Sequence, residues 1–204
     1  MNARDEVLTR LRAARPSGAV TVSRDYDPPA PDGTDLVELL TDRLLDYRAT
    51  VRRCDAAALP TVLASLLTDA SVVVVPPGLP SAWLGGTDVA QLTDDGGLTP
   101  GQLDLPGAVV VTGCAIACAR TGTIILDAGP DQGRRVLTLV PDRHICVVRV
   151  DQVVYGIPEA LSRLTDPTRP LTMISGPSAT SDIELNRVEG VHGPRHLTII
   201  LLLP

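Results

Sequence analysis

Short apolar runs separated by polar turns make up most of this chain. Six runs have the length and, for the most part, the β-branched content of strands: residues 72–75, 108–111, 123–126, 145–150, 171–174 and 197–203. Their apolar positions are nearly continuous rather than alternating, which is typical of strands covered on both faces. The pattern therefore predicts an α/β fold, a three-layer domain built on a mostly parallel sheet.

Helical periodicity marks the N-terminal part of the chain. Residues 2–14 carry apolar positions at helical spacing, and the proline-rich residues 16–33 read as an extended connector. We expect residues 1–55 to form an N-terminal helical segment with its connector. Residues 56–204 are then expected to form the α/β domain.

A long amphipathic helix is predicted over residues 36–54, with Thr34 or Asp35 as its cap. Its apolar face would consist of Leu36, Leu39, Leu40, Leu44, Tyr47 and Val51. This face can pack on its own domain or on a second copy, so a homo-oligomer stays open. Further helical stretches are predicted over residues 59–67, 87–91, 114–119, 133–139 and 158–164.

Composition narrows the chemistry that this chain can perform. The net charge is −6 and aromatic residues make up 2% of the chain, which argues against a nucleic-acid partner. All 18 basic residues are arginine, so Schiff-base chemistry and a P-loop lysine are excluded. The polar N-terminus lacks the core of a signal peptide, and no apolar run approaches the roughly 18 residues of a membrane span. We therefore expect a cytoplasmic protein.

The cysteines and histidines lack the spacing of a metal site. Cys54, Cys114, Cys118 and Cys146 contain no C-x-x-C pair, and the three histidines His144, His192 and His196 form no H-x-x-x-H or H-x-H pattern. There is also no G-x-G-x-x-G fingerprint for a dinucleotide. No metal and no cofactor is therefore expected in this chain.

Three polar loops, residues 120–123, 127–135 and 175–182, follow predicted strands or lead into them. If the strands are parallel, these loops share the sheet edge where open α/β folds bind ligands. In the second loop, Arg134 or Arg135 can hold a carboxylate or phosphate with two hydrogen bonds. The alternative is a solvated pair, or an ion pair with Asp127 or Asp131.

The third loop is the strongest candidate for binding a small anion. It runs from an apolar strand through Ser175, Gly176, Pro177, Ser178, Thr180 and Ser181 to Asp182, where a helix could begin. Backbone N–H groups and hydroxyls at such a junction bind phosphate or carboxylate. The alternative is ordinary capping, in which a serine satisfies the first turn and the glycine supplies the backbone conformation.

Further along, Asp182 and Glu184 are two residues apart, so in a helix they cannot form a shared carboxylate pair. Either can act as a general base, or Asp182 can stabilise a helix dipole while Glu184 pairs with Arg187. His192 lies in a tight loop between glycines, where it either binds a ligand or is satisfied by backbone.

Thr121, Gly122 and Thr123 are placed where a helix-like piece becomes a strand. The glycine either lets a ligand approach the backbone closely or simply makes the turn possible. Both interpretations stay open on the pattern alone.

The second half of the chain also carries an ordered set of family motifs. These are Ala119 with T-G-T-I-I-L at 121–126, L-T-L-V-P at 137–141 with His144, V-R-V-D-Q-V at 148–153, G-P-S at 176–178 with Thr180, D-I-E at 182–184 and G-V-H-G-P at 190–194. Together they resemble the LUD-domain family, in its lactate utilization protein C (YkgG-like) branch. The resemblance implies a fold related to the ribose-5-phosphate isomerase and CoA-transferase group. It also implies work with two partner proteins, one or both iron–sulfur, in oxidising L-lactate to pyruvate.

Three positions depart from the family pattern. Arg120 stands where the family usually has Glu, Cys118 replaces an aliphatic residue, and Ala179 replaces a basic one. A guanidinium in place of a carboxylate reverses the local field, so a mechanism that needs that Glu is in doubt here.

These observations favour an accessory or substrate-binding subunit of a lactate-oxidising system. It would bind a small anionic ligand at loop 175–182, and iron–sulfur clusters would be held only by partner subunits. One alternative is an independent enzyme acting on a sugar phosphate or a CoA thioester. The other is a degenerate structural partner, which Arg120 supports; whether the chain is an enzyme stays open.

Overall fold

The computed structural model of the chain describes residues 2–14, 22, 29–166, 168–177, 179–181, 187–189 and 192–204. Its centre is a six-stranded sheet in the order β1-β12-β7-β4-β2-β3, and every neighbouring pair is parallel. The strands are β1 (Thr50–Cys54), β2 (Val72–Val75), β3 (Gln91–Thr93), β4 (Ala108–Thr112), β7 (Arg143–Arg149) and β12 (His196–Leu202). The predicted α/β fold with a mostly parallel sheet is confirmed.

A second, four-stranded sheet has the order β8-β5-β6-β9. It consists of β8 (Val153–Val154), β5 (Ile116–Cys118), β6 (Thr123–Leu126) and β9 (Thr172–Ile174). In it, β6 is antiparallel to both β5 and β9. Strands 123–126 and 171–174 are therefore not parallel to each other, so the condition under which the three polar loops would share one edge is not met. The turn before β6 and the loop after β9 meet at one end, and the 127–135 loop leaves from the other.

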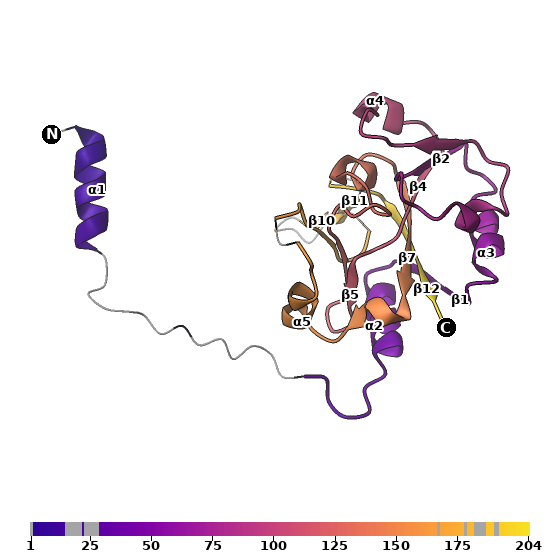
Figure 1. The fold of residues 1–204 in the computed structure, drawn as a ribbon, viewed down its shortest axis with the longest axis horizontal. Coiled ribbons are helices and arrows are strands. Elements are labelled where there is room, and N and C mark those ends of the chain that lie inside the picture. The colour runs from indigo at the N-terminus through magenta and orange to yellow at the C-terminus, as the bar shows by residue number, and fades with distance from the viewer. Residues whose placement is uncertain are drawn as a thin grey trace.

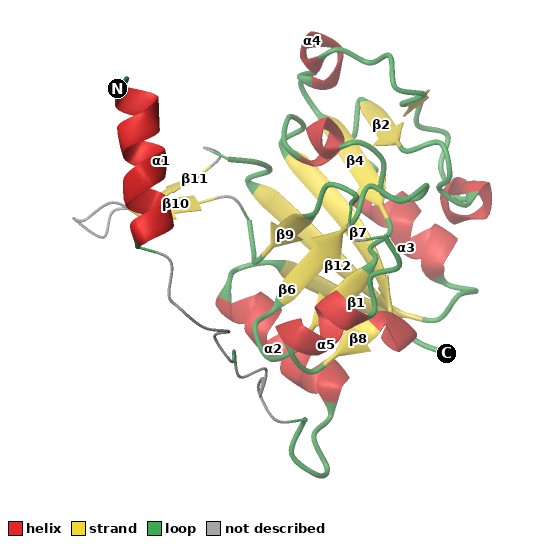
Figure 2. Ribbon diagram, turned by 60° about the vertical axis from the view of Figure 1, so that its left-hand side comes forward, coloured by secondary structure: helices red, strands yellow, loops and turns green. Residues whose placement is uncertain are grey.

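Helices cover both faces of the large sheet (Figures 1 and 2). The helices described along the chain are α1 (Ala3–Ala13), which buries no residue, α2 (Leu36–Asp46), α3 (Leu59–Leu66), α4 (Pro100–Leu103) and α5 (Ile157–Ser162), with 3-10 turns η1 (Ser81–Leu84), η2 (Arg135–Thr138) and η3 (Val150–Gln152). One face packs on α3 and η1 around Val109, Ile145 and Ile200. The other packs on α2 and the second sheet around Cys146, Val148 and Ile199. Apolar residues from three layers therefore form the core.

The prediction of a long helix over residues 36–54 was wrong beyond Asp46, where α2 ends. Helix α2 ends in a Schellman motif, in which the N–H of Arg48 donates to Leu45 O at 2.8 Å and that of Ala49 to Leu44 O at 3.0 Å. Arg48 supplies the left-handed conformation, with φ of 66°. The chain then enters β1, which pairs with β12. The apolar face of α2 packs on the domain itself, since Leu40 and Leu44 are fully buried.

Two shorter helix predictions were also wrong. Residues 87–90 form no regular element and lead into β3, and residues 116–118 are strand β5 in a tight pair with β6. The segment 121–123 therefore joins two strands and not a helix to a strand. Beyond Ser175, Ala179–Ser181 (β10) pairs antiparallel with Arg187–Glu189 (β11). A helix expected from Asp182 could not continue through β11.

Candidate functional site

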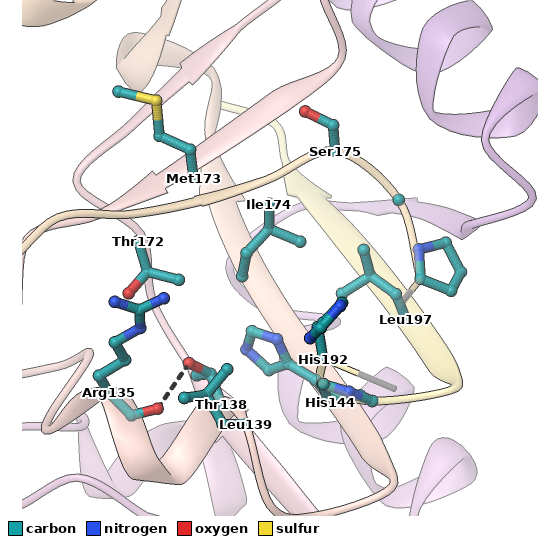
Figure 3. Close-up of a pocket in the computed structure, with 14 residues that line it drawn as sticks. Arg135, Thr138, Leu139, His144, Thr172, Met173, Ile174, Ser175, His192 and Leu197 are labelled. Atoms are coloured by element: carbon teal, nitrogen blue, oxygen red, sulfur yellow. Dashed lines mark hydrogen bonds between the residues drawn. The ribbon is translucent and has the colours of Figure 1, made fainter. Parts of the chain in front are cut away.

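A pocket of about 310 Å3 lies between η2, the end of β9 and the loop that leads into β12. It is hollowed beside the second residues of β7 and β12, at the amino ends of these strands. This differs from the carboxyl-end position expected for open α/β sheets. The cause is the antiparallel β9, whose carboxyl end reaches the amino ends of the larger sheet. Polar side chains line the pocket from Arg135, Thr138, His144, Thr172 and His192 (Figure 3).

His144 is the most unusual of the pocket residues, because its ring is buried and only one of its two nitrogens has a hydrogen-bond partner among the described residues. The residue is 1% exposed, and its Nε2 lies 2.8 Å from Oγ1 of Thr112. Nδ1 is buried and has no hydrogen-bond partner among the described residues. Burial lowers the pKa of His144 to about 4, so the ring is neutral at physiological pH. A buried nitrogen without a partner destabilises the folded state, so Nδ1 has hydrogen-bonding capacity left for a water or a ligand.

Arg135 brings an unneutralised positive charge to the same pocket. It is exposed, and no residue of the described part of the chain forms an ion pair with its guanidinium. Its carbonyl oxygen accepts a hydrogen bond from Thr138 at 3.2 Å, which holds the 3-10 turn η2. In Figure 3 the arginine enters from one wall and the imidazoles of His144 and His192 from another. The guanidinium is therefore available to a carboxylate or a phosphate.

Arg134, the neighbouring candidate, lies apart from this pocket. Its guanidinium donates to both carboxylate oxygens of Asp94, at 2.8 and 2.6 Å, and to Leu98 O at 2.8 Å. The hydrogen bonds from Arg134 to the carboxylate hold the pKa of the Asp94 carboxyl below its usual value. The structure thus pairs Arg134 with Asp94, and neither Asp127 nor Asp131 is its partner. Arg135 reaches the pocket in its place.

A chain of hydroxyl groups links the first and third candidate loops. Oγ1 of Thr121 lies 2.7 Å from Oγ1 of Thr123, which in turn lies 2.9 Å from Oγ of Ser175. Ser175 lines the pocket, whereas the two threonines do not. The structure therefore brings Thr123 and Ser175 together. Ser175 borders the pocket, but its hydroxyl lies beside Thr123 and points away from the other pocket residues (Figure 3).

The two glycines of these loops are required by contacts within the protein. Gly122 has φ of +62°, and a Cβ there would meet Cβ of Arg43 at 2.8 Å. Gly176 has φ of +85°, and a Cβ there would meet Cβ of Tyr47 at 2.5 Å. Both glycines thus let the loops approach the end of α2, although Gly176 also borders the pocket together with Pro177.

Several candidate residues cannot be placed in the pocket. Ser178, Asp182 and Glu184 lie outside the described residues, and of Thr180 only the backbone, in β10, is described. By contrast, the candidate His192 does line the pocket, and it is exposed.

Arg120, the departure from the family pattern, lies away from the pocket. Its guanidinium carbon is 5.8 Å from the ring centroid of Tyr155, in a cation–π arrangement. The backbone N–H of Arg120 donates to the carbonyl oxygen of Tyr155 at 3.0 Å. The side chain is exposed and does not line the pocket.

A second pocket, of about 280 Å3, lies at the carboxyl ends of β4 and β7 beside the 127–133 loop. Arg149, Arg163 and Arg169 line it, but each already has an acidic partner. Arg149 pairs with Asp151 at 3.0 Å and Arg163 with Glu159 at 2.7 Å. Arg169 lies 3.5 Å from Asp166 and 3.8 Å from Asp127. The charges of this pocket are therefore largely balanced within the protein.

The sequence pattern gives three of the pocket residues no ligand role. Thr138 lies in an expected helix and Thr172 in an expected strand, and His144 immediately precedes another expected strand. The available signal is the polarity of His144 beside an otherwise apolar run, in a strand whose inner positions are buried. No group of three or more His, Cys, Asp or Glu side chains suited to a metal was found among the described residues. The same part of the chain holds no helix long and apolar enough to cross a membrane.

Comparison with known proteins gives consistent matches. Residues 106–202 match the LUD domain. The chain is 46% identical to a lactate utilization protein C of Deinococcus radiodurans, over 97% of this chain and 94% of that protein. It is 33% identical to a lactate utilization protein C of Bacillus subtilis over 102 residues, 46% of this chain and 42% of that protein. A crystal structure of a DUF162 family protein from Deinococcus radiodurans superposes with a TM-score of 0.70 at 42% identity, covering 82% of this chain and 96% of that one.

Proposed function

This chain belongs to the LUD domain family, and from that membership we propose that it serves in lactate utilization as a ligand-binding subunit. Its ligand is a small carboxylate, the L-lactate or pyruvate of a lactate-oxidising system. The system is cytoplasmic, and this chain contributes binding and not electron transfer. The observation that carries the proposal is a pocket holding an unneutralised arginine and a buried imidazole nitrogen without a partner.

The pocket offers each part of such an acid a complementary group. Arg135 has the planar fork of donors that binds a carboxylate through two hydrogen bonds. Nδ1 of His144 is suited to the oxygen on the neighbouring carbon, because a neutral imidazole nitrogen donates or accepts according to its tautomer. Leu139, Ile174 and Leu197 supply an apolar wall for the hydrocarbon end.

Titration calorimetry with L-lactate and pyruvate tests the proposal directly. Binding is expected for the native protein, and Arg135→Gln should weaken it about tenfold or more, because one charge-assisted contact is lost. Arg134→Gln is the matched control, since that side chain is held by Asp94. No binding of either acid, with binding of a sugar phosphate or a CoA thioester instead, would favour an independent enzyme of the isomerase and CoA-transferase type.

We further propose that the partners are iron–sulfur subunits which carry the electrons from lactate. The names of the relatives support a role in lactate utilization, and the iron–sulfur partners are what the family resemblance implies. Affinity capture of the tagged protein from its own host grown on lactate should recover iron–sulfur proteins in defined proportion. Recovery of the chain without any iron–sulfur protein would contradict the partnership while leaving the calorimetric result intact.

A further inference from the structure

We infer that His144 and Thr112 together let the pocket hold both a 2-hydroxy acid and the corresponding 2-oxo acid, through exchange of the tautomer of one buried imidazole. The inference rests on the proposed function, because it concerns the same pocket and the same class of ligand. It adds which atoms distinguish the reduced acid from the oxidised one.

The starting point is the pair of nitrogens on one enclosed ring. Nε2 of His144 lies 2.8 Å from the hydroxyl oxygen of Thr112, and Nδ1 has no partner among the described residues although it is buried. The ring lines the pocket, and both residues are buried, with Thr112 fully enclosed. Any molecule that contacts Nδ1 is therefore coupled to Thr112 through the ring.

A neutral imidazole carries one N–H and one lone pair, so its two nitrogens always have opposite roles. A threonine hydroxyl can serve either role, because it donates one hydrogen and accepts at its oxygen. If Thr112 donates to Nε2, the ring proton is on Nδ1, which then donates into the pocket. If Thr112 accepts from the N–H of Nε2, the Nδ1 lone pair faces the pocket as an acceptor.

These two arrangements match the two oxidation states of the ligand. The hydroxyl of a 2-hydroxy acid donates to the Nδ1 lone pair, whereas the carbonyl oxygen of a 2-oxo acid accepts from the N–H of Nδ1. In both cases the ring keeps one proton, and Thr112 keeps its own and rotates. Burial keeps the imidazole neutral, and the cationic ring would lose this adaptability because both of its nitrogens donate.

A fixed tautomer would behave differently. One of the two acids would then face an imidazole nitrogen of the wrong polarity, which leaves a buried group unsatisfied and lowers affinity roughly tenfold. With the exchange, the 2-hydroxy acid and the 2-oxo acid bind with affinities within about fivefold of each other. The site would thus bind the substrate and the product of a two-electron oxidation with similar affinity.

The nitrogen chemical shifts of 15N-histidine-labelled protein report the tautomer directly. With L-lactate, Nε2 of His144 should carry the proton, and with pyruvate the proton should be on Nδ1. His144→Gln identifies the signals by their loss. Thr112→Ser keeps the hydroxyl and should bind both acids within about twofold of the native protein, whereas Thr112→Val should weaken both about fivefold.

Two results overturn the inference and are distinguishable. If both acids bind but His144 shows one tautomer throughout, or if only one acid binds, the exchange is refuted while the carboxylate site stands. If neither acid binds and the histidine signals do not move, the proposed function fails together with it. The native protein supplies the decisive spectra, so the test does not depend on the folding of a variant.

Discussion

Nε and Nη2 of Arg134 donate hydrogen bonds to the two carboxylate oxygens of Asp94, at 2.8 and 2.6 Å. Arg135, the next residue along the chain, lines the pocket instead. The side chain of Asp94 is 1% exposed, and its carboxylate also accepts from the N–H of Gly96 at 3.2 Å. The two arginines diverge because the 3-10 turn η2 begins at Arg135, after an extended Arg134. Adjacent residues of the same type therefore have a structural role and a binding role.

This division predicts that one substitution changes the stability of the fold by different amounts at the two positions. Arg134→Gln should lower the free energy of unfolding by about 2 kcal/mol, because it leaves a buried carboxylate without its cation. Arg135→Gln should change it by less than about 0.5 kcal/mol, as an exposed residue without an ion pair. Urea denaturation of both variants at neutral pH measures the difference. Equal losses would show that Arg134 does not stabilise the fold through Asp94.

The buried ring of His144 predicts a dependence of stability on pH. Its pKa is about 4 in the folded protein and 6.5 for an unperturbed histidine, so between these values the unfolded chain binds a proton that the folded one does not. The stabilisation is complete above pH 6.5 and is lost as the pH falls towards 4. The total change is on the order of 3 kcal/mol.

Urea denaturation at several pH values between 4 and 7 measures this slope. In His144→Gln the slope across that window should become shallower, whatever the stability of the variant at pH 7. His196→Gln is the matched control, because His196 is exposed at the start of β12. A slope that is the same in the native protein and in His144→Gln would contradict the assignment.

Elements stabilised by their own residues could be predicted from the sequence, and those that depend on distant partners could not. Strands β2 and β6 have the predicted bounds, because each is a short run of mostly β-branched residues. The end of α2 was missed because a Schellman motif usually carries glycine, and here Arg48 takes its place. Strand β1 was missed because β12, nearly 150 residues later, supplies its pairing.

In the candidate site, too, the features set by local residues were predictable and those set by distant partners were not. A Ser/Thr loop bordering a pocket was predictable from its hydroxyl and glycine content, and Ser175 lies there. The contribution of His144 was not predictable, since its burial and its bond to Thr112 arise only when β4 and β7 pair. Nor could the sequence distinguish Arg134 from Arg135, because the choice depends on where one 3-10 turn begins.

The hydroxyl chain predicts an energetic coupling between two distant residues. Thr123 and Ser175 are 52 positions apart, and their hydroxyl oxygens lie 2.9 Å from each other. Thr123→Val and Ser175→Ala should each cost about 1 kcal/mol, and the double variant should cost less than their sum by about 0.5 kcal/mol or more. Denaturation of the four proteins in the cycle measures the coupling. Strict additivity would mean that the contact does not contribute to stability.

The last prediction concerns Gly176, which joins the pocket to the end of α2. Gly176→Ala adds a Cβ at 2.5 Å from Cβ of Tyr47, at a residue whose φ of +85° already disfavours a side chain. Gly33 is the matched control, because its φ is +79° and an added Cβ meets nothing within 4 Å. Gly33→Ala should therefore cost only the backbone strain, about 1 kcal/mol.

Gly176→Ala should cost about 1 to 3 kcal/mol more than this, because the Cβ of Tyr47 is fixed to the backbone and cannot rotate away. Denaturant titration of the two variants isolates the steric part, since backbone strain is common to both. Calorimetry with L-lactate then shows whether moving the loop also moves Ser175. If both alanine variants are equally stable, the close approach of this loop to α2 does not limit residue 176 to glycine. If Gly176→Ala is the less stable and also binds more weakly, packing against α2 is what positions the loop for its ligand.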